Sequence, residues 1–115
     1  MYQFPYAEVL DDAPKAARER ERKALEHCIA LLRSAQAHGA RSREAVEALV
    51  FLRKLWSTLI EDLANSENDL PKPLRADLIS IGLWVMREAE DIRLEKSGSF
   101  DDLIEVCQVI CDGLK

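Results

Sequence analysis

Three cysteines and two histidines are the candidate nitrogen and sulfur ligands for a zinc ion in this chain. Cys107 and Cys111 are four residues apart and would share one helical face, while His27 and Cys28 could supply two further zinc ligands. However, adjacent residues such as His27 and Cys28 point about 100° apart on a helix. Cys107 also lies on an apolar stripe, where a thiol behaves as a small hydrophobic side chain. We therefore expect three reduced thiols, no bound metal and no cofactor.

Catalytic chemistry is not indicated by the remaining polar residues. The sequence contains no glycine-rich phosphate-binding loop, and neither His27 nor His38 has a serine or carboxylate arrangement near it that suggests an activated nucleophile. We expect no catalytic residues, and we do not expect the protein to be an enzyme.

A basic run, RERERK at 18–23, is the only candidate for nucleic-acid binding. Its positive and negative charges alternate, which is typical of a solvated helix surface supported by pairs three and four residues apart. No set of aromatic residues for base stacking and no recognition helix accompanies the run, and the net charge of -5 opposes binding to phosphates. Direct nucleic-acid binding is therefore not expected.

The aromatic residues are more informative about function. Tyr2, Phe4 and Tyr6 are three of only seven aromatic residues (two Trp, two Tyr and three Phe), and Pro5 interrupts them. A short, broken apolar segment of this kind needs a surface to lie on. It could fold back over the rest of the protein, or it could anchor a partner, since aromatic residues dominate many interfaces. Both interpretations hold if the segment and a partner compete for one groove.

Trp56 and Trp84 allow two interpretations of the same kind. Each follows a leucine in an apolar helical segment, so packing in the core is the first interpretation. At the edge of a groove, either ring could instead contact a helical partner. The candidate partner-binding residues are therefore Tyr2, Phe4, Tyr6, Trp56 and Trp84.

Four helices are needed to position these residues. Pro14 suits a first helical turn, Gly39 suits a left-handed helix end, and Ser42 is a good N-cap. Apolar residues recur at steps of three and four, with breaks at the polar, proline-containing NSENDLPKP stretch and at Gly98. The buried stripes predicted for the last two helices are Leu74, Leu78, Ile81, Val85 and Ile92, and Phe100, Leu103, Cys107, Ile110 and Leu114. The predicted helices span about 14–38, 42–64, 72–96 and 99–112.

The predicted fold is all-α, a compact bundle of about four amphipathic helices in a single domain over 14–115, preceded by an extended segment over 1–13. Amphipathic helices of this length are stable only when their apolar faces pack together. The second and third helices carry extra apolar residues and are expected to be central. Gly82 within the third helix indicates a close crossing with a neighbouring helix.

Membrane insertion and secretion are not expected. No window approaches 18 consecutive apolar residues, and the first residues lack the basic and apolar regions of a signal peptide. We expect a cytoplasmic protein.

Several motifs resemble the FlaF flagellar protein family of alphaproteobacteria. The resemblance extends from YAEV and ARERE to Gly113. It is most specific in LWSTL, in the loop formed by Asn68, Leu70 and Pro71, in LRADLISIGLWV, and in the closing DGL. No single motif is diagnostic, but their order and spacing carry the resemblance.

The resemblance implies a cytoplasmic, non-enzymatic factor for flagellum biogenesis and motility. Proteins of this family promote flagellin synthesis and export, act opposite the regulator FlbT, and behave as secretion chaperones that bind flagellin. The alternative is a post-transcriptional regulator of flagellin expression that acts through messenger RNA or FlbT. The family has no catalytic residues to transfer to this chain.

Overall fold

A computed structural model describes residues 6–96 and 99–113, with side chains described from residue 16 onward. This part of the chain forms four α-helices and no strands. They are α1 (Tyr6–His38), α2 (Arg43–Ala64), α3 (Lys72–Arg93) and α4 (Phe100–Gly113). The all-α bundle predicted from the apolar periodicity is confirmed.

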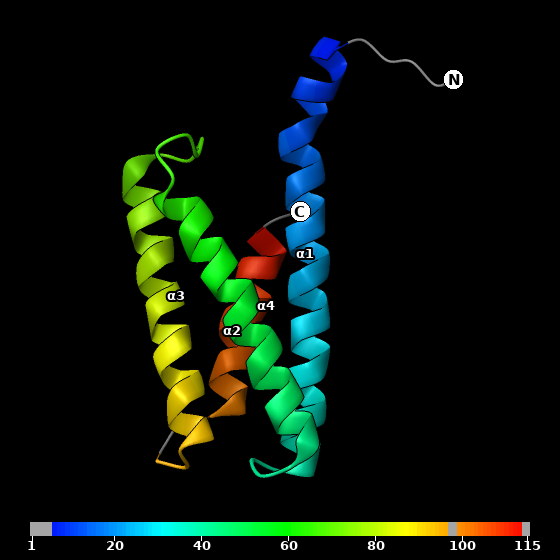
Figure 1. The fold of residues 1–115 in the computed structure, drawn as a ribbon, viewed down its shortest axis with the longest axis vertical. Coiled ribbons are helices and arrows are strands. Elements are labelled where there is room, and N and C mark those ends of the chain that lie inside the picture. Colours follow the sequence, from blue (N-terminus) through cyan, green and yellow to red (C-terminus); the bar gives the residue numbers. More distant parts are fainter. Residues whose placement is uncertain (1–5, 97–98, 114–115) are drawn as a thin grey trace, which may run out of the picture.

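The first helix begins earlier than predicted. The backbone is helical from Tyr6 onward, so the segment expected to be extended over 1–13 is helical over 6–13, and residues 1–5 lie outside the described part. Pro14 therefore lies within α1 instead of at its start. A proline inside a helix removes one backbone hydrogen bond, but the good helix formers on both sides of it continue the helix. The N-terminal turns of α1 extend beyond the other helices (Figure 1).

The turn between α1 and α2 follows the predicted end signals. Gly39 has φ 97°, a left-handed conformation that favours glycine, and its N–H donates to the carbonyl oxygen of Ala35 at 2.8 Å. The hydroxyl oxygen of Ser42 accepts from the N–H of Ala45 at 3.1 Å, which caps α2. These contacts join α1 and α2 in an antiparallel pair.

The helices pack in the order α3, α2, α1, α4. Helix α2 packs against both α1 and α3, and α4 packs against α1. Helix α3 contacts α4 only slightly and α1 not at all. Thus α1 and α2 are central, whereas α3, which we expected to be central, lies at an edge (Figure 1). The molecule is 19 Å along its shortest axis, about two helix diameters.

The core is aliphatic except for one large ring. Its largest fully buried side chain is Trp56, which belongs to one core cluster with residues of all four helices that include Leu25, Leu52, Val85 and Leu103. Because the core lacks buried polar or charged residues within the described part, burial of apolar surface is what holds the helices together.

The end of α3 departs from the sequence-based expectation. The helix stops at Arg93, and Glu95 instead of Gly98 takes the left-handed conformation, with φ 55°. The N–H of Lys96 donates to the carbonyl oxygen of Asp91 and that of Glu95 to Ile92, the bonds of a Schellman motif. Gly98 lies outside the described residues.

The left-handed backbone conformation of Glu95 predicts how substitutions at this position change the free energy of unfolding. A residue with a side chain in the left-handed region costs about 1 kcal/mol or more relative to glycine. The Glu95 carboxylate also accepts a hydrogen bond from Arg41 Nε at 2.7 Å. We expect Glu95→Gly to unfold with a free energy about 1 kcal/mol higher than Glu95→Ala, because both variants lose the ion pair and only the first relieves the strain. Urea denaturation compares the two, and equal midpoints would contradict the strain.

Candidate protein-binding groove

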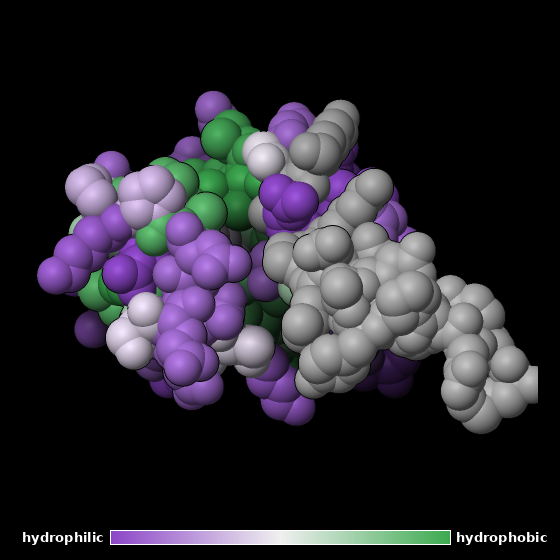
Figure 2. Space-filling view, turned by 90° about the horizontal axis from the view of Figure 1, so that it is seen from above, coloured by the Kyte–Doolittle hydropathy of each residue, from purple (hydrophilic) through white to green (hydrophobic). Residues whose placement is uncertain are grey.

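An apolar hollow of 360 Å³ lies at the end of the bundle that holds the α2–α3 loop. Its apolar lining comes from all four helices and the loop, through Leu25, Trp56, Leu59, Leu70, Leu78 and Ile110. Viewed onto this end, hydrophobic residues lie exposed between hydrophilic ones (Figure 2). The backbones of α3 and α1 do not approach each other and those of α3 and α4 approach only slightly, which leaves room for the hollow among the described residues.

A second hollow, of 310 Å³, lies between α3 and α4. Its lining is almost wholly apolar and includes Ile81 and Trp84 of α3 and Val106 and Val109 of α4. Ile110 lines both hollows, so that they adjoin. We refer to the two hollows together as the apolar groove.

The α2–α3 loop is held in shape by two asparagines. The side-chain oxygens of Asn65 and Asn68 accept from the N–H groups of Glu67 and Leu70, each at 2.9 Å. The Asn68 amide group also donates to the backbone and carboxylate oxygens of Asp62, at 3.2 Å each. These bonds fix Leu70 at the edge of the groove.

Arg75 of α3 fixes the same end of α2. Its Nη1 donates to the carbonyl oxygens of Leu63 at 3.3 Å and Asn65 at 2.9 Å. These carbonyls lie at the C-terminus of α2, where the helix dipole favours a cation. These bonds therefore hold the loop and the start of α3 against α2. The side of α3 that faces away from α2 forms the open wall of the groove.

Charged groups at the rim of the groove are mostly acidic. The first hollow is lined by four carboxylates, Glu21, Asp62, Glu67 and Asp69, and by one guanidinium, Arg18. Burial, and secondarily the charge of Asp62, raise the pKa of Glu21, while Arg20 partly opposes them. The groove thus combines an apolar floor with a negative rim.

The two tryptophans predicted as partner-binding candidates differ in burial. Trp56 is 1% exposed, which confirms the core interpretation, although its ring also forms part of the groove floor. Trp84 is half-buried and lines the second hollow. Tyr2 and Phe4 lie outside the described residues, and of Tyr6 only the backbone is described, as the first residue of α1.

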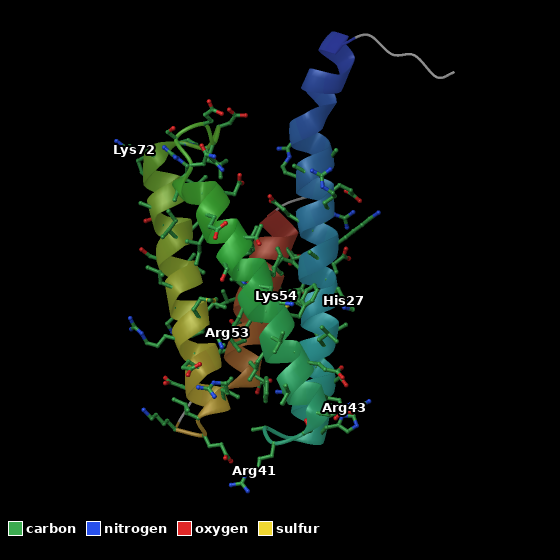
Figure 3. All side chains as sticks on the ribbon, in the orientation of Figure 1. His27, Arg41, Arg43, Arg53, Lys54 and Lys72 are labelled. Carbon is green, nitrogen blue, oxygen red and sulfur yellow. The ribbon has the colours of Figure 1, made fainter. Side chains whose placement is uncertain are left out.

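The cysteines take the core positions expected of small hydrophobic residues. Cys28, Cys107 and Cys111 are all buried and none forms a disulfide. The Cys28 thiol hydrogen-bonds with that of Cys107, and this bond together with burial raises the pKa of Cys28. His27 is exposed and points toward α2 (Figure 3), where it packs edge-on against Phe51 with ring centroids 4.9 Å apart. Within the described residues no cluster of three potential metal ligands occurs.

One cation of the basic run of α1 is paired with acidic residues of the same helix. Arg22 forms ion pairs with Glu19 and, at 3.3 Å, with Glu26. The hydrogen bond that Arg22 donates to the Glu19 carboxylate raises the pKa of Arg22. The labelled basic side chains of the other helices are spread along the bundle (Figure 3). This arrangement does not favour binding to a phosphate backbone.

Several groove residues were not predicted from the sequence. Leu70 stands in a polar loop, Leu78 and Ile110 were assigned to core stripes, and the carboxylates of Glu21 and Asp62 are 41 positions apart. Besides Trp56 and Trp84, the sequence signal in this region was the Asn68, Leu70, Pro71 motif, which the structure explains as the loop that carries Leu70.

These features define a small all-α protein that offers an apolar groove with an acidic rim. No described helix is long and apolar enough to cross a bilayer. The model of a protein family described as flagellar protein FlaF matches residues 2–114, nearly the whole chain. The chain therefore belongs to the FlaF family of flagellar proteins, as its motifs indicated. No match is found among curated proteins or solved structures.

Proposed function

We propose that this protein is a cytoplasmic flagellin chaperone that holds an amphipathic helix of flagellin in the apolar groove until export. The observation that carries the proposal is the groove itself, an apolar surface left open between α3, α1 and α4. A helix with one apolar face can bury that face in such a groove. Flagellin termini are amphipathic and prone to assemble, so that covering one would keep flagellin unpolymerised.

The competing function is control of flagellin expression through messenger RNA or FlbT. Binding to RNA would release counterions and weaken steeply as salt rises from about 50 to about 200 mM. Burial of an apolar helix would change little with salt and would give a negative heat-capacity change. Calorimetry of the protein with flagellin, FlbT and flagellin messenger RNA, each at two salt concentrations, separates the three partners.

The groove makes a specific prediction for flagellin binding. We expect Leu70→Asn combined with Leu78→Asn to weaken flagellin binding at least about tenfold, because both leucines would bury apolar surface against the bound helix. Calorimetry measures the affinity, and circular dichroism checks that the variant remains folded.

A matched control is available on the same helix. Leu74 and Leu83 are 43% and 54% exposed and line neither hollow. Leu74→Asn combined with Leu83→Asn should leave flagellin affinity unchanged. Equal losses in the two double variants, or no loss in either, would contradict the proposed role of the groove.

A further inference from the structure

The acidic rim of the groove contains a repulsive pair of carboxylates. Glu21 of α1 and Asp62 of α2 line the same hollow, and the charge of Asp62 acts on Glu21. No ion pair joins Glu21 to any side chain that the structure describes. The Glu21 side chain is half-buried and that of Asp62 is exposed. Repulsion between two like charges at such a site opposes folding.

The surrounding charges do not balance this pair. From α1, Arg18 lines the hollow and Arg20 acts on Glu21 from a more exposed position. From the loop, Glu67 and Asp69 add two further negative charges. Helix α3 contributes Leu78 and α4 contributes Ile110 to the lining of this hollow, and both side chains are apolar.

A further cation, Arg75, does not line the hollow. Arg75 stands at the start of α3, but its Nη1 group is bonded to the carbonyl oxygens at the end of α2. Asp62 accepts one hydrogen bond, from the Asn68 amide at 3.2 Å. Two carboxylates therefore face the hollow with capacity to accept more hydrogen bonds than the described side chains supply.

We propose that the helix bound in the groove carries a lysine or arginine at the edge of its apolar face, and that this cation sits between Glu21 and Asp62. The negative rim complements such a cation, and the apolar floor complements the rest of the face. The pair would then select basic amphipathic helices over acidic ones of equal hydrophobicity. The identification of the partner as flagellin rests on the proposed function. The expected basic and amphipathic character of the bound helix does not.

The test separates binding from stability. Glu21→Gln should weaken flagellin binding about fivefold, because a charge-assisted hydrogen bond to the partner is lost. The same change should raise the Tm of the unbound protein, because the repulsion from Asp62 is removed. Glu61→Gln is the matched control, since Glu61 is exposed on α2 beside Asp62 and does not line the groove, and it should change neither quantity.

The affinity should also depend on pH with a definite sign. The bound cation favours ionised Glu21, so that wild-type affinity should fall as pH decreases through the raised pKa of Glu21. Glu21→Gln should show a smaller fall over the same range. Equal pH profiles for the two proteins would contradict a cation at this position.

Two amphipathic peptides with the same apolar face make the outcome independent of flagellin. One carries lysine and the other glutamate at the edge positions. We expect the lysine peptide to bind more tightly to wild type, with the preference reduced by Glu21→Gln. If wild type binds the lysine peptide selectively but not flagellin, the proposed function fails and the inference stands. If flagellin binds and neither the Glu21 change nor the peptide charge matters, only the inference is overturned.

Discussion

Trp56→Ala is expected to lower the free energy of unfolding by about 3 to 5 kcal/mol, the usual cost of removing a large ring from a packed core. The Trp56 side chain is the largest of the fully buried ones, and it packs where all four helices meet. A loss of this size is a large fraction of the stability of a small domain. Urea denaturation followed by circular dichroism measures it.

Trp84→Ala provides the comparison for this result. Because the Trp84 ring is half-buried and lines the second hollow, its removal should cost less stability than removal of Trp56. A stable Trp56→Ala protein that has lost only flagellin binding would contradict the core role and would make Trp56 a binding residue instead.

Gly82→Ala is expected to lower the free energy of unfolding by about 1 to 2 kcal/mol, although alanine normally favours a helix by about 1 kcal/mol over glycine. A Cβ atom at position 82 would lie 2.8 Å from Ile60 Cγ1 and 3.0 Å from Trp56 Cε3. Overpacking of this kind typically costs about 1 to 3 kcal/mol, because neighbouring side chains or helices must move. Chemical denaturation measures the net effect.

A second substitution reduces the expected loss. In an Ile60→Ala background the contacts with Ile60 are removed and the 3.0 Å contact with Trp56 Cε3 remains, so that Gly82→Ala should become less destabilising or neutral. Ser80→Ala, at an exposed position on the same helix, is the control for helix propensity alone. If Gly82→Ala stabilises the protein in both backgrounds, the close crossing of α2 and α3 does not constrain this position.

Local patterns in the sequence were sufficient for the fold class and most helix boundaries. The apolar steps of three and four predicted the four helices, and Gly39 and Ser42 marked the turn between the first two. Gly82 indicated the close crossing that the structure contains. The helix pattern and the turn signals depend on neighbours within one or two helical turns, which a sequence displays directly, whereas Gly82 indicated a crossing without indicating which helix it meets.

Boundaries that depend on competing local effects were less accurate. Pro14 was taken as a helix start, but the helix formers before it extend α1 to Tyr6. Gly98 was taken as the stop of α3, but a strained Glu95 ends it earlier. Leu74 was assigned to a buried stripe and is 43% exposed, because α3 packs mainly on α2 and its first turn lies beyond the core.

The groove depends on relations that periodicity does not encode. Trp84 was a candidate from its residue type alone, and it lies in the groove. The approach of Glu21 to Asp62, and the space between α3 and α1, depend on which helices pack together. Periodicity did not determine the order of the helices in space, since α3 was expected to be central and lies at an edge, and the site follows from that order.

The most direct test of flagellin binding in the groove is a ¹H–¹⁵N NMR titration with a peptide of the amphipathic flagellin terminus. The chain has two tryptophans, and each lines one of the two hollows. We predict that the indole signals of both Trp56 and Trp84 shift on binding, while the amides of Val46 and Val50, exposed on α2 and lining neither hollow, do not. Unchanged indole signals, with shifts confined to Val46 and Val50 or to the basic run of α1, would contradict the account.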